Sequence, residues 1–116
     1  MQRIYEYRRR LPHYQSDSKA IFATFATRRR RIPPEPARTI CLEAILQGNG
    51  KRFVLHAAVV MPDHVHVVFT PLADDNGPFS VSQIMQVIKG ASAHRINAAL
   101  GSTGRVWQEE SFDRVL

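Results

Sequence analysis

Two apolar runs separated by only four residues constrain the fold of this chain more than any other feature. Residues 53–60 and 65–70 both consist mainly of valine, alanine and phenylalanine, the composition of buried strands. The connection between them, 61–64, contains Pro62. Such a short connection predicts two adjacent antiparallel strands, with the proline at the turn, where its missing donor does little harm.

Strand and helix patterns also alternate before this hairpin. Residues 21–27 alternate in the manner of a strand. Prolines at 33, 34 and 36 then break that strand, and apolar side chains recur at intervals of three and four residues after them. This spacing predicts a helix over 36–47, which the glycine-rich segment 48–50 ends. Residues 1–18 are basic and polar, and we expect an irregular arm there.

After the hairpin the chain carries a second helix signal. Ser80 stands three residues before Gln83, the arrangement of a capping box, and apolar residues at helical spacing follow it. The helix is predicted to end near Leu100, ahead of a glycine-containing turn. Residues 106–108 are then interpreted as a short final strand. The order of elements predicts an α+β fold, a ferredoxin-like (RRM-like) βαββαβ sandwich with an antiparallel sheet, formed by one domain over 1–116.

Two histidines stand two residues apart at the start of the second hairpin strand. Because side chains alternate along a strand, His64 and His66 point to one face, while Val65, Val67 and Phe69 supply the opposite, core-facing one. The helices should cover the valine face and leave the histidines on the open face. Imidazole nitrogens suit divalent transition ions, so the pair is a candidate metal site. A chance pair of surface histidines is the competing interpretation.

Three other residues receive structural interpretations. We expect Cys41 to be a core residue of the first helix, and His56 to be a hydrogen-bonded sheet histidine rather than a metal ligand. Trp107 is predicted to be a core or edge anchor. With a single cysteine, an intrachain disulfide and a multi-cysteine zinc site are excluded.

No apolar run approaches the roughly 18 residues that a membrane span needs. The N-terminal residues include no apolar signal-peptide stretch, so we expect a cytoplasmic protein that does not bind membranes.

Four segments of the chain resemble one protein family. Residues 61–69, Met-Pro-Asp-His-Val-His-Val-Val-Phe, resemble the His-hydrophobic-His (HUH) motif of the single-tyrosine transposases, in particular the REP-associated tyrosine transposases and related insertion-sequence enzymes. Residues 10–28 are similar to the family's basic opening segment and first strand. Residues 82–90 and 106–113 are similar to its second helix and the Trp-containing strand after it.

The resemblance implies transposase chemistry on single-stranded or hairpin DNA. In the family a divalent ion, Mg²⁺ or Mn²⁺, is held by the histidine pair and a third polar ligand and polarises the scissile phosphate. A tyrosine attacks that phosphate and becomes joined to the DNA 5′ end. His64 and His66 are therefore the expected catalytic and metal-binding residues. Related insertion-sequence enzymes form dimers, whereas the REP-associated enzymes resemble single-chain versions, so the resemblance leaves a homodimer and a monomer open.

The basic character of the chain agrees with a DNA partner. The net charge is +6 with a pI near 10.2, and several arginines lie in runs. The alternative to DNA contact, both for these runs and for Lys89 and Arg95 of the second predicted helix, is a solvated surface. The expected DNA-binding residues are Arg8, Arg9, Arg10, Arg28, Arg29, Arg30, Lys89 and Arg95.

The chain departs from the family at the nucleophile. In the family the nucleophilic tyrosine and the third ligand lie on a helix beyond the Trp-containing strand, and no tyrosine follows Tyr14 here. We expect a truncated member that is inactive alone, with the nucleophile unassigned. Alternatively, the helix comes from elsewhere or an N-terminal tyrosine has been recruited, although packing or stacking is the favoured interpretation of Tyr5, Tyr7 and Tyr14.

Three function classes remain open from the sequence. The leading one is a DNA-cleaving and strand-transferring transposase. The second is a non-catalytic single-stranded DNA-binding or regulatory module derived from it, and a covalent protein–DNA adduct would separate the two. The third is an RNA-binding or structural ferredoxin-like module, which the absence of paired aromatic residues on the central strands disfavours.

Overall fold

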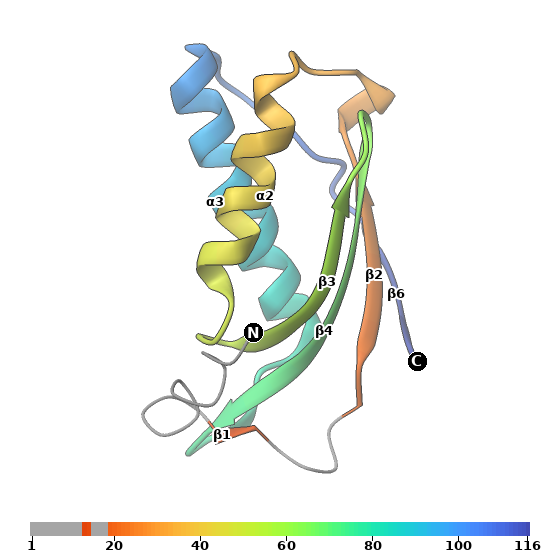
Figure 1. Cartoon of the computed structure of the whole chain (residues 1–116), viewed down its shortest axis with the longest axis vertical. Coiled ribbons are helices and arrows are strands. Elements are labelled where there is room, and N and C mark those ends of the chain that lie inside the picture. Colours follow the sequence, from red (N-terminus) through yellow and green to blue (C-terminus); the bar gives the residue numbers. More distant parts are fainter. Residues whose placement is uncertain (1–12, 15–18) are drawn as a thin grey trace.

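The hairpin of two apolar strands forms the centre of the sheet in the computed structural model, which describes residues 13–14 and 19–116 (Figure 1). Strand β3 (Phe53–Val60) and strand β4 (His64–Asp74) are antiparallel, with Val60 opposite Val65, as predicted. Strand β4 begins at His64 itself and extends four residues beyond the predicted end at Thr70. Both histidines therefore belong to a regular strand.

The described strands form one antiparallel sheet. Strand β2 (Ile21–Ala26) pairs with β4 on the side opposite β3, and strand β6 (Phe112–Val115) pairs with the outer edge of β2. The spatial order β3, β4, β2, β6 is that of the ferredoxin-like fold, which confirms the predicted class.

Two short strands extend the far end of β4. Strand β1 (His13–Tyr14) and strand β5 (Gly77–Pro78) both pair with β4 near Ala73. The predicted irregular arm is therefore wrong at His13 and Tyr14, because the backbone of β4 continues past the main sheet and offers them a pairing edge. The rest of the arm lies outside the described residues.

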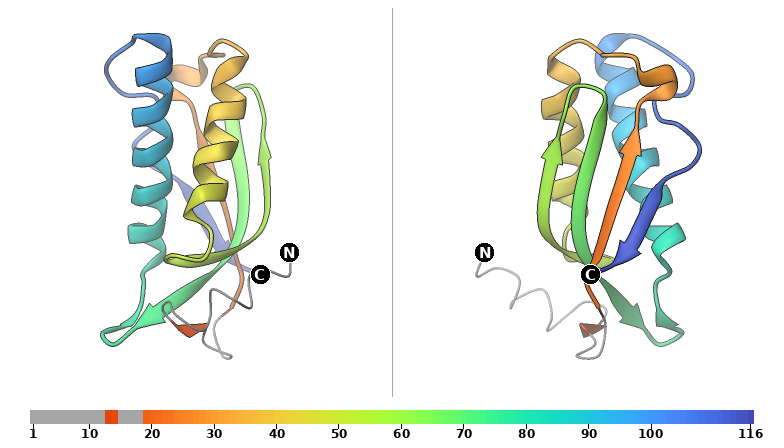
Figure 2. Two further views of the ribbon diagram at one scale, coloured as in Figure 1. Left: turned by 60° about the vertical axis from the view of Figure 1, so that its left-hand side comes forward. Right: turned by 90° about the vertical axis from the view of Figure 1, so that its right-hand side faces the viewer.

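Helix α2 (Pro36–Gly48) and helix α3 (Val81–Leu100) lie side by side on one face of the sheet, as Figures 1 and 2 show. Both predicted helices are confirmed. The Ser80 hydroxyl accepts a hydrogen bond from the backbone N–H of Gln83, and the Gln83 side chain accepts one from Ser80, which forms the expected capping box. Gly101 ends α3 in the left-handed conformation (φ 64°) that glycine adopts readily.

The core lies between the helices and the alternate residues of the central strands. Val65, Val67 and Phe69 are fully buried, and Ala23 and Phe25 of β2 pack beside them. Cys41 of α2 is also buried in this layer, as expected. Since these side chains occupy the covered face, the alternate residues of β2 and β4 face away from the helices, on the side shown at the right of Figure 2.

The predicted final strand is wrong. Trp107 forms only an isolated bridge with Thr27, and the last strand is β6, five residues beyond it. Trp107 is an anchor, as expected: its ring meets that of Phe25 in a T-shaped arrangement with centroids 4.7 Å apart, and its indole N–H donates to Ser92 Oγ at 2.9 Å. Residues 106–108 thus have apolar side chains because Trp107 is buried, and not because their backbone belongs to a continuous strand ladder.

Candidate functional site

His64 and His66 lie together at the start of β4, on the face of the sheet that the helices leave open. Their ring centroids are 4.8 Å apart, and the ring planes are nearly perpendicular at 78°. Both side chains are half-buried. The period-two geometry of the strand and the apolar partners Val65 and Val67 fix this common direction.

Each imidazole is held through its Nδ1 atom. His64 Nδ1 lies 2.8 Å from Asp63 Oδ1, and His66 Nδ1 lies 2.8 Å from Thr24 Oγ1 on the neighbouring strand. When Nδ1–H donates to such an oxygen, the lone pair of the neutral ring is at Nε2. The Asp63 carboxylate can only accept, so its contact prepares Nε2 of His64 to act as a ligand, in the way that outer-shell oxygens orient metal-binding histidines. The Thr24 hydroxyl holds the His66 ring in place.

Asp63 connects the histidine pair to the arginine run. Its Oδ2 atom accepts from Arg30 Nη2 at 2.8 Å and from Arg30 Nε at 3.0 Å, while Oδ1 faces His64. The hydrogen bond with His64, aided by Arg30, holds the pKa of the Asp63 carboxyl below its usual range. Asp63 therefore stays ionised and keeps both partners in place near neutral pH. These contacts make Asp63 an orienting group for His64.

The arginine run folds into a short 3₁₀ turn, η1 (Arg28–Arg30), at the end of β2. Buried Thr27 fastens this turn to the loop before His64. Its N–H donates to the Asp63 carbonyl at 2.9 Å, and its hydroxyl donates to the Arg31 carbonyl at 2.6 Å. Arg29 and Arg30 have left-handed φ angles of 59° and 55°, a conformation that costs energy for residues other than glycine.

A cavity of about 460 Å³ lies beside this turn. Arg28, Arg29 and Arg31 line it together with Arg105 from the segment after α3. Its remaining lining mixes apolar and polar residues. These are Thr27, Ile32, Pro33, Pro34, Ile96, Asn97, Leu100, Ser102, Thr103 and Val106. Four arginines thus contribute to the lining of one cavity, although the guanidinium of Arg105 is paired with Glu109 at 3.4 Å. Arginine side chains in such a cluster suit phosphate oxygens.

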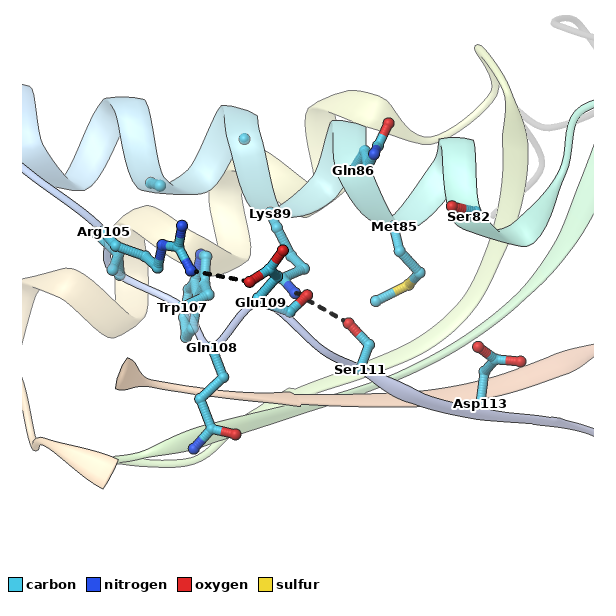
Figure 3. A pocket seen from close by; sticks show the side chains of 13 residues that line it. Ser82, Met85, Gln86, Lys89, Arg105, Trp107, Gln108, Glu109, Ser111 and Asp113 are labelled. Atoms are coloured by element: carbon cyan, nitrogen blue, oxygen red, sulfur yellow. Dashed lines mark hydrogen bonds and ion pairs between the residues drawn. The ribbon is translucent and has the colours of Figure 1, made fainter. Parts of the chain in front are cut away.

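The two predicted DNA-binding residues of α3 lie elsewhere. Lys89 lines a second cavity, of about 500 Å³, between α3 and residues 105–113 (Figure 3). Its ammonium donates to the Glu109 carbonyl at 2.9 Å and to Ser111 Oγ at 3.1 Å, and partial burial lowers its pKa. Arg95 donates to Gln47 of α2 at 3.0 Å. Both therefore belong to the helix layer and are not brought to the histidines.

The other candidate residues also lie away from the histidine pair or outside the described part of the chain. His56 faces Thr70, with 2.7 Å between Nε2 and Oγ1, which confirms a hydrogen-bonded sheet histidine. The backbone of Tyr14 pairs with Leu72, eight residues from His64 along β4, or roughly 27 Å of extended strand. The residues Arg8, Arg9, Arg10, Tyr5 and Tyr7 lie outside the described part of the chain.

Sequence reasoning missed an aromatic and basic group beside the pair. Phe22 stacks on His66, with ring centroids 5.5 Å apart and an interplanar angle of 20°. The Arg114 guanidinium lies over the ring of Phe22, 5.7 Å from its centroid. The alternation of 21–27 could have placed Phe22 on this face, but the position of Arg114 depends on the pairing of β6 with β2, which the sequence does not indicate.

Within residues 19–116, no group of three or more His, Cys, Asp and Glu side chains could hold a metal ion. The donor chemistry of the site is thus two imidazoles, which fit two coordination positions of a divalent ion. No helix among the described residues is long and apolar enough to cross a membrane.

The fold and site define a ferredoxin-like α+β protein with a histidine pair on its open sheet face and arginines at the same end. The family model described as "Transposase IS200 like" matches residues 14–114. The chain belongs to this family of IS200-like transposases. No curated protein matches the sequence significantly.

Two solved structures share the fold. A candidate transposase from Deinococcus radiodurans R1 is 20% identical, with a TM-score of 0.63, over 88% of this chain and 82% of that one. A REP-associated tyrosine transposase bound to a REP hairpin is 24% identical, with a TM-score of 0.62. That match covers 90% of this chain but 61% of the other, so this chain spans about three fifths of that transposase.

Proposed function

We propose that this chain binds single-stranded or hairpin DNA at the histidine end of the open sheet face, and that it acts there in metal-dependent cleavage and strand transfer. The observation that carries the proposal is the arrangement of His64 and His66, whose Nδ1 atoms face Asp63 and Thr24 and whose Nε2 atoms can serve as ligands. Membership of the IS200-like transposases supports the chemistry, and the REP-hairpin complex of a structurally similar transposase supports the partner.

His64 and His66 would hold a divalent ion, Mg²⁺ or Mn²⁺, at the phosphate to be cleaved. When bound, such an ion supplies Lewis-acid stabilisation of charge that develops on a phosphate oxygen. Asp63 and Thr24 keep the imidazoles oriented, and Arg30 keeps Asp63 ionised. The third ligand of the family's site has no counterpart assigned in this chain.

The arginine turn is the proposed contact for the DNA backbone. Arg28, Arg29 and Arg30 stand at the end of the sheet that carries the histidines, because Thr27 and Asp63 join the turn to that loop. Guanidinium groups bind phosphate oxygens without selecting sequence, so this contact would position the strand. Lys89 and Arg95 remain predicted contacts of a different surface, that of the helices.

A second candidate function is a non-catalytic module that holds DNA for another nucleophile. The observation that favours it is the position of Tyr14, whose backbone pairs at the opposite end of β4 from His64. In this alternative the strand transfer is performed by a tyrosine that this chain does not supply.

A titration of the purified chain with Mn²⁺ tests the metal site. Electron paramagnetic resonance detects binding as a loss of the free-ion signal. We expect binding by the wild type and its loss in His64→Ala and in His66→Ala. His56→Ala is the control, since His56 is also a sheet histidine, more exposed than the pair, but is engaged by Thr70. Unchanged binding in the first two variants would refute the metal site.

A labelled hairpin oligonucleotide with Mn²⁺ then separates the two functions on a denaturing gel. A covalent adduct that His64→Ala abolishes establishes the cleavage and strand-transfer function. Binding of the hairpin in native gels without any adduct establishes the DNA-holding module.

A further inference from the structure

One row of side chains crosses all four strands of the main sheet on its open face. His66 of β4 is paired with Val59 of β3 on one side and with Thr24 of β2 on the other. Thr24 is in turn paired with Phe112 of β6. Since directly paired residues point to the same face, Phe112 stands in the same row as the metal-site histidine, two strands away.

Phe112 is unusually open for an aromatic side chain on a sheet. Its exposed fraction is 59%, whereas Phe22, Phe25, Phe53 and Phe69 are half-buried or fully buried. It begins β6 next to the cation of Arg114, which lies over Phe22 in the adjoining row. A solvent-exposed aromatic ring next to a guanidinium group suits a ligand that has a flat aromatic part and a negative charge beside it.

We infer that Phe112 is a stacking platform for one unpaired base of the DNA strand whose phosphate lies at His64 and His66. This inference rests on the proposed function and names a base-contacting residue for it. Two strand spacings separate Phe112 from His66, or about 10 Å, so the stacked base belongs to a nucleotide adjoining that phosphate and not to a distant part of the strand.

The chemistry of the row favours single-stranded nucleic acid as the occupant. Bases of a duplex are stacked on one another, whereas an unpaired base offers a free π face. Phosphates on either side of that base would meet Arg114 at one edge and Arg30 near the histidines at the other. A flat apolar protein partner would cover the Arg114 guanidinium and the half-buried imidazoles without supplying an acceptor or a counter-charge.

The test measures affinity for a set of labelled single-stranded oligonucleotides in which one abasic site is moved along the strand. We expect Phe112→Ala to weaken binding of the intact strand by about tenfold, the usual loss for one stacked base. At one position the abasic site should weaken the wild type to a similar extent and leave Phe112→Ala unaffected. Phe112→Trp should keep the affinity and show fluorescence quenched by the intact strand but not by that abasic strand.

Val115→Ala is the matched control, because Val115 is equally exposed (58%) on the same strand but pairs with Ile21 on the other face. Its affinity should equal that of the wild type. If Phe112→Ala binds the intact strand and every abasic strand with the same affinity as the wild type, the stacking platform is refuted and DNA binding stands. If the wild type binds no oligonucleotide, the proposed function itself is overturned and this inference with it.

Discussion

Asp63 joins the first histidine of the pair to the arginine turn. One carboxylate oxygen faces the imidazole of His64, and the other accepts two hydrogen bonds from Arg30. The pKa of Asp63 is lowered chiefly by His64. Because the pKa is lower in the folded chain, the ionised carboxylate stabilises the fold above its ordinary pKa, and this contribution is lost as the pH falls through the lowered value.

The variant Asp63→Asn should therefore weaken both the metal site and the fold. An amide cannot hold Arg30 and the protonated Nδ1 of His64 with charge-assisted bonds, so we expect affinity for Mn²⁺ to fall by about 10-fold to 100-fold. Paramagnetic resonance titrations give that affinity. In urea unfolding, the stability difference from the wild type should disappear as the pH is lowered through the lowered pKa of Asp63.

Asp75→Asn is the control for this prediction, because Asp75 is an exposed residue of the turn after β4. It should leave metal affinity unchanged. Equal Mn²⁺ affinity of Asp63→Asn and the wild type would show that the carboxylate does not orient His64.

The histidine pair was predictable from the sequence, but its partners were only partly so. Spacing by two residues on a strand suffices to place His64 and His66 on one face. Thr24 and Arg30 are 42 residues from His66 and 33 residues from Asp63, respectively. No local pattern reports such contacts, since they depend on the register of β2 against β4 and on the path of the chain after β2.

At the scale of elements, Thr27 joins the arginine turn to the hairpin loop. Its backbone and side chain together bind the carbonyl groups of Arg31 and Asp63, and its side chain is buried. The turn that follows has two left-handed arginines, so its conformation must be held by contacts outside itself.

Replacing this hydroxyl should loosen the turn measurably. Thr27→Val keeps the shape and the backbone bond but leaves the Arg31 carbonyl without its donor, so we expect the free energy of unfolding to fall by about 1–2 kcal/mol. Urea unfolding followed by far-ultraviolet circular dichroism measures this change. Thr27→Ser retains the hydroxyl and should be the more stable of the two variants; the opposite order would contradict the role assigned to the hydrogen bond.

The last strand shows why elements of similar composition cannot always be distinguished. Val106 and Trp107 have strand-like side chains, yet Trp107 is buried against Phe25 and Ser92 from an irregular segment. Strand β6, by contrast, is exposed throughout and mixes charged with apolar residues. Its existence depends on the free edge of β2, which no local pattern reports, and the exposed sheet position of Phe112 was therefore not predictable either.

At the scale of the whole molecule, the fold separates two surfaces. Helices α2 and α3 cover one face of the sheet (Figure 2). The register of the strands places the histidines, Thr24 and Phe112 on the other face. This layering was predictable, because the alternation of β4 and the order of elements both required it. The distribution of the cations was not, since runs of basic residues lie at both ends of the sheet, Arg28–Arg31 at one and Lys51 and Arg52 at the other.

The two ends give the DNA-binding proposal a quantitative test. Arg28 and Arg29 lie at the end of the sheet that carries the histidines, whereas Lys51 and Arg52 lie in the connection between α2 and β3 at the opposite end (Figure 1). Each phosphate contact to a single strand adds about 0.7 to the slope of log affinity against log salt concentration. Arg28→Gln combined with Arg29→Gln should therefore lower that slope by about 1.4 in fluorescence anisotropy titrations.

The charge-matched pair Lys51→Gln and Arg52→Gln should leave the slope unchanged, although both double variants lower the net charge of +6 by the same two units. A difference between them therefore reports where the strand lies and not the overall field of the protein. Equal reductions in slope would mean that the DNA is attracted by net charge alone. A larger reduction from the variants in the α2–β3 connection would place the backbone contact at the opposite end of the sheet from the histidines and would contradict the proposed site.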